Sequence, residues 1–352
     1  SIRDVIRYTN VFMLKYELLR EETDPIDLLG LTSLQVFEPS VYSKLPSYKD
    51  AICGANHSYS HSLQNTDEEK VKSAVSSIIP NNGTVANREA ANYVLGILFP
   101  RTKTAVGLSY NIGRSYSHSD FVINNNIAAP ECFDRYFALT LENDAIATIM
   151  VKHLIYESTA NELSDGIIQL YEEGKIIRLL EEIEAYASKE HSTAIPSDRA
   201  SLIITALVRN WSSFDVDDRG FFSIPFAWRL LFCVDPLLKA MDSSLRFPCI
   251  HSIFYDEKVQ PSTLALLLND FETQLGRFTE GTSDGVNAIF SLEEVLELES
   301  IFKTRAIDAI DSGDEFKQHQ GLSFFWMLEQ IDAELAARKK KLLISDDISL
   351  VK

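Results

Sequence analysis

The segment IDLLGLTSLQVFEPSVYSKLPSYKDAIC, residues 26–53, is the part of the sequence from which the fold is argued. Asp24-Pro25 comes directly before it, and an acceptor side chain followed by Pro in the first turn is a strong signal for a helix start. We expect this helix to close at Phe37-Glu38, and Pro39 then starts a second, short helix. The segment therefore favours a helical chain with a break at Pro39.

Length and composition are those of a large globular protein. The chain has 352 residues, which is long for one hydrophobic core, so two or three cores or an extended helical array are expected. Its hydrophobic content of 45% leaves ample apolar surface to bury. No CxxC pair is present, so we expect buried free thiols in a reducing compartment, the cytoplasm. The four cysteines are Cys53, Cys132, Cys233 and Cys249.

The charge balance argues against nucleic acid and membrane surfaces as direct partners. A net charge of −18 repels phosphate backbones and anionic lipids unless a local basic patch overcomes it. The compact basic cluster, residues 338–341, is best interpreted as a solvated helix end that complements the helix dipole. The most apolar window, residues 221–238, carries Arg229, Asp235 and two prolines, which predicts a buried core helix and no membrane span. The polar start SIRDVIRYTN is not a signal peptide.

Helical periodicity dominates the rest of the chain. The fold class we predict is mainly α: a multi-helical array in one body or two subdomains, with few or no short strands. The best strand candidates are short pieces near Val122 and Phe137, and residues 101–126 are expected to form a long surface loop. The expected helices are residues 1–20, 66–79, 87–99, 142–157, 161–173, 175–189, 196–211, 224–239, 262–277, 292–311 and 323–341.

The first of these helices presents two faces. Ser1 is its expected cap, and Asp4 lies in the first turn, where an acidic residue is favoured. The apolar stripe consists of Val5, Phe12, Tyr16 and Leu19. A separate polar face carries Arg3, Arg7 and Asn10.

Two stretches imitate ligand-binding loops but lack their essential residues. Between Gly107 and Gly113 there are five residues where a phosphate-binding loop has four, and Arg114 stands in place of the lysine. The acidic stretch 215–220 resembles a calcium loop, but Phe226 occupies the position of the bidentate glutamate. We therefore expect neither a triphosphate site nor a calcium site in this chain.

Three further groups of residues were weighed as catalytic or metal sites. His57 and His61 are four apart in a serine-rich loop, without cysteines or clustered carboxylates, so a zinc site is not expected. Residues 117–120, Ser-His-Ser-Asp, contain triad residue types, but a triad is assembled in space and not by adjacency. Cys132 has no base to activate it and is expected to be a buried thiol. No catalytic or metal residue is assigned, and an enzyme acting through His57, His61 or the 107–120 loop stays a third hypothesis.

Three segments in order carry a family pattern. They are S-x-R-D-x-x-R-x-x-N from Ser1 to Asn10, D-x-x-x-L-x-x-L-x-V-F-E-P-x-V-Y from Asp27 to Tyr42, and FDRYF at residues 133–137, with LFPR at residues 98–101 upstream of the third. These motifs resemble the KAP family of P-loop NTPases, in the part that follows the nucleotide-binding core. The resemblance extends weakly to about Trp211 and is absent beyond it.

The resemblance implies that the chain is the C-terminal portion of a larger protein. The Walker A and B elements, and with them ATP and Mg²⁺, would belong to a core on the N-terminal side, so the chain alone would not be catalytic. Residues 1–54 would be the end of the NTPase module with its junction helices, residues 55–220 the helical region similar to the family, and residues 221–352 a helical region without a recognised counterpart.

The resemblance also suggests roles for two motifs. Arg3 and Arg7 match family positions and are the candidate nucleotide-proximal residues, because related P-loop ATPases offer an arginine to the phosphates from a helix after the core. The alternative is that both form salt bridges at the junction with that core. FDRYF is expected to pack as an aromatic anchor, with Asp134 and Arg135 pairing outward.

The leading functional hypothesis is therefore a helical regulatory or sensing region of a bacterial KAP-type NTPase. It would couple the ATP state of the core to a protein partner or to oligomerisation, and family association suggests phage defence in a cytoplasmic or membrane-associated parent protein. Residues 101–126 and the acidic helices after Asn161 are the expected contact surfaces. The alternative is a free-standing acidic helical scaffold with no nucleotide link.

Overall fold

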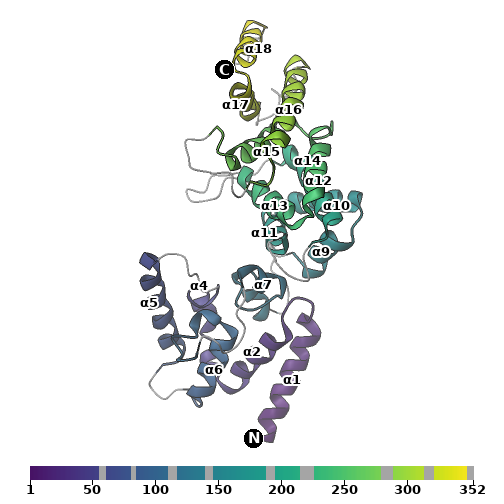
Figure 1. Ribbon diagram of the computed structural model, residues 1–352. Helices are drawn as coiled ribbons and strands as arrows, with labels where there is room; N and C mark the ends of the chain where they lie inside the picture. Colours follow the sequence, from purple (N-terminus) through teal and green to yellow (C-terminus); the bar gives the residue numbers. More distant parts are fainter. Residues whose placement is uncertain are drawn as a thin grey trace. The chain divides into compact units, whose positions relative to one another are not determined.

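The computed structural model describes residues 1–54, 61–80, 85–109, 117–138, 146–187, 195–214, 226–278, 288–312 and 321–346. Helices are the only regular structure in these ranges, which confirms the prediction of a mainly α chain (Figure 1). The chain forms two compact units, unit 1 from Ser1 to Lys152 and unit 2 from His153 to Lys352. The segment boundaries expected after residues 54 and 220 stay predictions.

Unit 1 begins with two long helices that pack side by side (Figure 1). Ser1 and Asp4 form a capping box on the first helix, and Asp24 caps the second, whose first residue is Pro25. Pro39 starts the next helix. These three predicted starts are confirmed. The elements of unit 1 are α1 Ile2–Leu19, α2 Pro25–Phe37, α3 Pro39–Tyr42, η1 Leu45–Tyr48, α4 Lys49–Ile52, α5 His61–Ile78, α6 Arg88–Leu98, η2 Pro100–Thr102, α7 His118–Ile123, α8 Pro130–Phe133, η3 Asp134–Tyr136 and α9 Thr148–Lys152.

The segment 26–53 supplies much of the core of unit 1. Its inward apolar residues are almost completely shielded from solvent and meet Phe99, Phe133 and Tyr136 from later elements. Burial of a large aliphatic side chain contributes about 1.5–3 kcal/mol, so this segment is a substantial source of stability for unit 1. Its core residues are Leu28, Leu31, Leu34, Val41, Leu45, Ile52 and Cys53.

Several predicted features of unit 1 are wrong. The strand pieces near Val122 and Phe137 do not form, because a capping box between Ser117 and Asp120 starts α7 and Phe137 follows the 3-10 turn η3. The expected surface loop 101–126 contains α7, whose apolar side chains are buried, whereas residues 110–116 lie outside the described residues. Helix α5 begins before the expected capping box.

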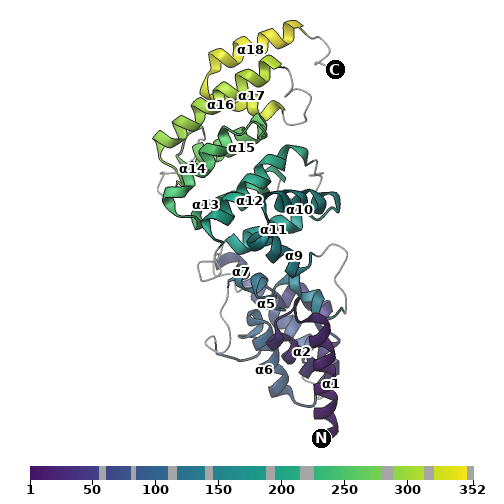
Figure 2. The ribbon, with the colours of Figure 1, turned by 90° about the vertical axis from the view of Figure 1, so that its right-hand side faces the viewer.

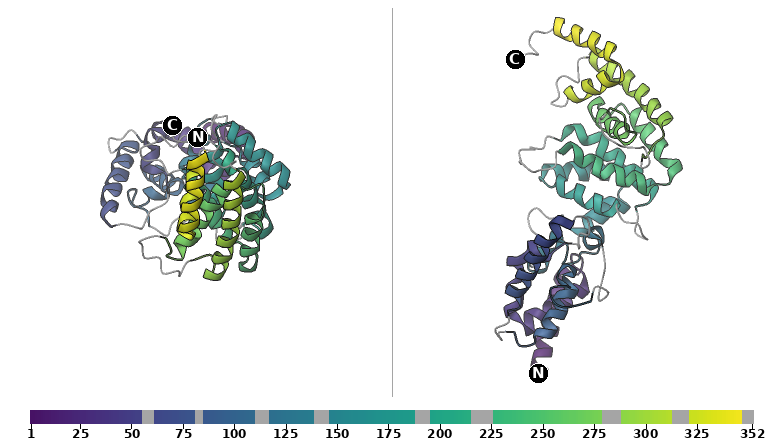
Figure 3. Two further views of the ribbon diagram at one scale, coloured as in Figure 1. Left: turned by 90° about the horizontal axis from the view of Figure 1, so that it is seen from above. Right: turned by 60° about the vertical axis from the view of Figure 1, so that its left-hand side comes forward.

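Unit 2 is a stack of helices in which each helix packs on the one two places later, α10 on α12 and α11 on α13 (Figures 2 and 3). Helix α15 packs against α13, α16 and α17. Of the expected helix 142–157, residues 142–145 lie outside the described residues, and the rest contains α9 followed by one π-helical turn, η4. The elements are η4 His153–Glu157, α10 Ala160–Glu172, α11 Ile176–Ala187, α12 Ser197–Asn210, η5 Trp211–Ser213, α13 Phe226–Ala240, α14 Ser243–Phe254, α15 Pro261–Gln274, α16 Leu292–Ser312, α17 Gly321–Ile331 and α18 Ala333–Asp346.

Helix α14 is not among the helices expected from the sequence. Pro248 lies inside it, and an interior proline removes a backbone hydrogen bond and argues against a helix. The tertiary environment compensates, because Cys249, Ile250, Ile253 and Phe254 are buried. All four cysteines of the chain are buried and free, as predicted.

Three arginines of unit 2 cap the C-terminal ends of neighbouring helical segments. Arg199 of α12, Arg246 of α14 and Arg305 of α16 each donate hydrogen bonds to backbone carbonyls just past a helical segment. The last carbonyls of a helix lack partners within it, so a guanidinium with several donors can satisfy more than one of them. The accepting carbonyls are those of Leu154, Ile155 and Ser158 for the first arginine, Lys239 and Met241 for the second, and Phe254, Asp256 and Val259 for the third.

We predict that Arg305→Ala lowers the free energy of unfolding of unit 2 by about 2–4 kcal/mol, because it leaves three carbonyls without their charged donor. All three tryptophans of the chain, Trp211, Trp228 and Trp326, belong to unit 2, so urea unfolding followed by tryptophan fluorescence measures this unit. Lys258→Ala, the loss of an exposed cation in the loop after α14, is the matched control and should cost less than about 0.5 kcal/mol. Equal costs for the two variants would refute the capping role.

Candidate functional site: the outer face of helix α1

Helix α1 exposes a row of large apolar side chains. Ile2 is 82% exposed and Leu14 is 61% exposed. Single exposed apolar residues are ordinary on a protein surface, but a contiguous set of them marks an interaction site. We call this set, together with Arg3 and Arg7, the α1 face. Its apolar members are Ile2, Val5, Ile6, Met13, Leu14 and Leu18.

The predicted buried stripe of α1 is confirmed at three of its four positions. Phe12, Tyr16 and Leu19 pack on the core, whereas Val5, in the more exposed N-terminal half of the helix, is 58% exposed. Lys15 is also buried: its ammonium lies 3.5 Å from the hydroxyl of Tyr42 and over the ring of that tyrosine.

The pKa of Lys15 is lowered because burial disfavours its charged form. The helix therefore turns a lysine stem toward the core and leaves more hydrophobic residues outside.

The α1 face has a defined arrangement along the helix. At 3.6 residues per turn, Ile2, Ile6 and Met13 fall on one side, and Leu14 and Leu18 fall on the other. The two sequence-predicted arginines lie on the same side as Leu14 and Leu18, nearer the N-terminus of the helix. The face thus combines hydrophobic contact area with positive charge, whereas the whole chain is strongly acidic.

Arg3 and Arg7 lie where the sequence analysis placed them, on one exposed side of α1 together with Asn10. Within the described part of the chain, neither arginine forms an ion pair or a hydrogen bond. The pKa of Asp4 lies below its usual value, chiefly because the Ser1 side chain and the terminal ammonium bond to it, and Arg7 adds a smaller effect. Both guanidinium groups are therefore available to a partner.

Helix α2 also exposes large apolar side chains. Ile26, Leu29 and Phe37 of α2 are exposed. Tyr8 of α1 joins the two helices: its hydroxyl donates to the carbonyl of Leu29 at 3.1 Å, and its ring lies 5.7 Å from that of Phe37. The positions of the two helices are thus fixed by a direct bond.

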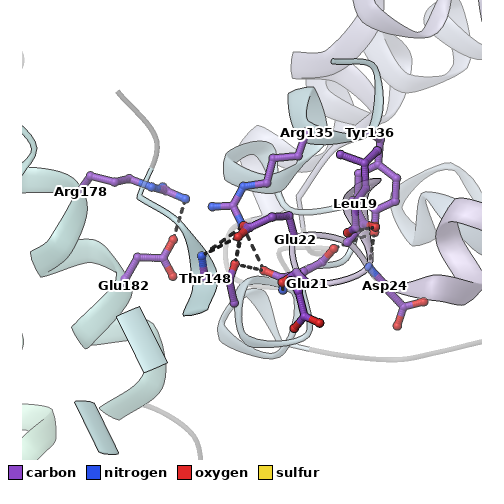
Figure 4. Close-up of polar contacts among 11 residues, drawn as sticks. Leu19, Glu21, Glu22, Asp24, Arg135, Tyr136, Thr148, Arg178 and Glu182 are labelled. Atoms are coloured by element: carbon purple, nitrogen blue, oxygen red, sulfur yellow. Dashed lines mark hydrogen bonds and ion pairs between the residues drawn. The ribbon is translucent and has the colours of Figure 1, made fainter. Parts of the chain in front are cut away.

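A buried polar network holds the C-terminal end of α1 in place (Figure 4). Arg135 is 4% exposed, and its Nη1 lies 3.4 Å from Glu22 Oε2, 3.2 Å from Asn125 Oδ1 and 3.0 Å from Thr148 Oγ1. The backbone N–H of Thr148 also donates to Glu22 at 3.0 Å. The expectation that Arg135 pairs outward is wrong, because Glu22 in the α1–α2 loop supplies a buried partner that local sequence does not reveal.

The other members of FDRYF divide between core and surface. Phe133 and Tyr136 are fully buried, which confirms the aromatic anchor, and the ring of Phe137 lies 4.8 Å from that of Phe133. Asp134 forms an ion pair with Lys49 of α4, where both side chains remain partly exposed.

Tyr136 ties the anchor to the start of α2. Its hydroxyl donates to the carbonyl of Asn125 at 2.7 Å and accepts from the N–H of Asp24 at 2.8 Å. Burial raises the pKa of Tyr136, so the phenol stays protonated and keeps its donor. Asn125 itself has a φ of 52°, a left-handed conformation that asparagine tolerates better than most residues. The carbonyl of Asn125, in the turn after α7, therefore contacts both the start of α2 through Asp24 and η3 through Tyr136.

The remaining sequence motifs do not assemble a catalytic or metal site among the described residues. Ser117 and Asp120 cap α7, and His118 pairs with Glu131 at 3.2 Å. No group of three or more His, Cys, Asp or Glu in the described ranges is arranged to hold a metal ion. His57, the imitation phosphate loop at residues 113–115 and the acidic stretch 215–220 lie outside the described residues.

Comparison with known proteins does not identify the chain. No family model matches it, and no curated protein or solved structure matches it significantly. The similarity to KAP NTPases therefore stays a prediction carried by the three sequence segments. In the part of the chain that the structure describes, no helix combines the length and the apolar character that crossing a membrane requires.

The two arginines of the α1 face were predicted as exposed residues, but its apolar members were not. The sequence did contain an indication of a second contact surface, because Ile2, Ile6, Met13, Leu14 and Leu18 lie outside the predicted buried stripe. A helix that is hydrophobic on more than one side has more than one contact to make.

We predict that Arg135→Met lowers the free energy of unfolding of unit 1 by about 3–5 kcal/mol, because it leaves Glu22 buried without its cation. Adding Glu22→Gln should recover at least half of this loss, since Gln keeps an acceptor for the Thr148 N–H but carries no charge. Hydrogen exchange of peptides from α1, α2 and η3 measures the effect.

Lys49→Met, which breaks the neighbouring and more exposed pair to Asp134, should cost less than about 1 kcal/mol. If the costs of Arg135→Met and Glu22→Gln simply add, the two side chains do not act as a pair.

Proposed function

We propose that the chain is a helical regulatory region that docks a protein partner through the α1 face. The partner is the P-loop NTPase core that the family resemblance expects on the N-terminal side. The single observation that carries the proposal is the exposure of six large apolar side chains on one well-capped helix, together with two exposed arginines that have no partner among the described residues. ATP and Mg²⁺ would bind in that core and not in this chain.

The energetics of such docking are favourable. A large apolar side chain that becomes fully buried contributes about 1.5–3 kcal/mol, and the apolar side chains of the α1 face are 48–82% exposed before binding. The helix is fixed in advance by its capping box and by the contacts of Tyr8 and Lys15 with α2 and α3. Little conformational entropy is lost when a rigid surface binds, so most of the hydrophobic gain is retained.

Arg3 and Arg7 would give this docking a nucleotide-dependent element. A cation near the transferred phosphoryl group compensates the charge that develops there, which is how a helix outside the core can respond to the presence of the γ-phosphate. In the alternative already stated, both arginines instead form salt bridges with acidic residues of the core. Both roles require the arginines to be unpaired in the isolated chain, as they are in its described part.

A second function uses the same face without a nucleotide. In that hypothesis the chain is a free-standing scaffold, and its stacked helices in unit 2 and net charge of −18 serve protein contacts alone. The two hypotheses differ in whether the partner binds ATP.

Calorimetric titration with ATP and Mg²⁺ distinguishes these functions. It should be run on this chain and on a version extended upstream to include the expected core. The proposal expects binding by the extended protein and none by this chain. Tight ATP binding by this chain alone would overturn it, and absence of any nucleotide site in the extended protein would favour the scaffold.

We predict that Leu14→Glu with Leu18→Glu weakens association of this chain with the separately produced core by at least about tenfold, because two charges replace buried apolar contacts. The melting temperature should stay within about 2 °C, since both side chains are more than half exposed. Ile149→Glu is the matched control, because Ile149 is 64% exposed but lies on α9. Equal effects of both changes would contradict the docking face.

Arg3→Ala and Arg7→Ala separate the two roles of the arginines. If they compensate charge on the nucleotide, the rate of ATP hydrolysis in the complex should fall while association changes little. If they only form junction salt bridges, association should weaken and become less sensitive to salt, whereas hydrolysis by the saturated complex should not change.

A further inference from the structure

Helix α15 carries a carboxyl group into each of two helix interfaces within unit 2. Asp270 lies beside Asp235 of α13, because Gln274 bonds to both, and Glu272 lies beside Glu299 of α16, because Arg277 contacts both. The helix packs against both of these neighbours, and Figures 2 and 3 show it in the middle of this part of the stack. Two like-charged side chains in contact at a buried interface are unfavourable unless a proton neutralises one of them.

The Glu272–Glu299 pair is the more buried of the two. Glu272 is completely buried and Glu299 is 9% exposed. Arg277, just after α15, reaches both: its Nη1 lies 3.1 Å from Glu272 Oε2 and its Nη2 lies 3.0 Å from Glu299 Oε1. One cation faces two carboxyl groups, so the site is electrically balanced only while one of them keeps its proton.

The Asp235–Asp270 pair repeats this arrangement on the other side of α15. The side-chain amide of Gln274 donates to Asp235 Oδ2 at 3.0 Å and to Asp270 Oδ2 at 2.6 Å. Lys239, on α13, is the cation nearest to the pair, at 3.9 Å from Asp235 Oδ2. The second oxygen of Asp235 is buried without a hydrogen-bond partner in the described structure, so a full negative charge there would be poorly stabilised.

We propose that two shared protons, one at each interface, act as a pH-sensitive clamp that holds α15 between α13 and α16. When either pair loses its proton, two carboxylates face each other with one cation between or beside them. Their repulsion weakens the packing of α15 against its neighbours. The stack of unit 2 would therefore be tightest at acidic pH and would loosen from α15 onward as the pH rises.

The titration behaviour of the same groups supports this direction. Burial, followed by contact with Glu299, raises the pKa of Glu272 to about 8, and Arg277 opposes the rise. Burial, followed by the charge of Asp270, raises the pKa of Asp235 to about 7, and Lys239 opposes it.

Both carboxyl groups have ordinary pKa values near 4 when unfolded, so the folded state keeps protons that the unfolded state has lost. This contribution to stability is complete below about pH 4. It is lost as the pH rises through about 7 for Asp235 and about 8 for Glu272.

Hydrogen exchange measured by mass spectrometry between pH 6 and pH 9 tests the clamp. After correction for the intrinsic exchange rate, peptides of α15 and α16 should lose at least about tenfold protection over this range. Peptides of α1 and α2 in unit 1 should keep theirs and serve as an internal reference. A flat profile for α15 and α16 overturns the proposal.

Two variants connect the profile to the named groups. Asp235→Asn and Glu272→Gln replace each shared proton by a neutral amide, so each should remove one step of the pH dependence and the double variant should have a flat profile. Glu293→Gln is the matched control, because Glu293 lies in the first turn of α16 and is exposed, and it should keep the wild-type profile. If the variants retain the wild-type loss of protection, the carboxyl pairs do not cause it and the clamp is wrong. If the double variant does not fold, the two single variants decide between these outcomes.

Discussion

The buried contact of Arg135 with Glu22, Asn125 and Thr148 is the constraint on which unit 1 depends. A guanidinium that is 4% exposed is costly unless each of its neighbours accepts from it. Meeting that requirement brings together the loop after α1, the turn after α7 and the start of α9, which are far apart in the sequence. Hydrophobic burial supplies most of the energy of the fold, but this contact determines which way α1 leaves the core.

The same physical problem, polar groups that folding removes from water, organises unit 2. Each helix end leaves carbonyls without partners, and arginines from α12, α14 and α16 satisfy them for an adjacent segment. Because each arginine belongs to a later helix than the carbonyls it binds, the bonds link successive layers of the stack. The carboxyl pairs of α15 belong to the same part of unit 2 and have too few cations for their charge. Stability in this unit therefore depends on protons as well as on apolar packing.

Local signals in the sequence were sufficient for the fold class and for many helix starts. Ser1, Asp24 and Pro39 define boundaries through interactions within one turn, so the sequence alone could find them. Arg135 and α14 could not be found in this way. The partner of the arginine lies more than a hundred residues earlier, and the proline in α14 is tolerated only because its neighbours are buried by other helices. The arginines of the α1 face were predicted because they are exposed by local periodicity, whereas the rotation of α1 about its axis depends on contacts with α2 and α3.

The burial of Lys15 contrasts with the exposure of apolar residues on the same helix. Lys15 is buried, at a cost that its lowered pKa records, and the bond from Tyr8 to α2 fixes the helix in this orientation. Six large apolar side chains that stay in water contribute no hydrophobic free energy to folding. A binding event that buries them would gain that free energy, and the proposed docking rests on this difference.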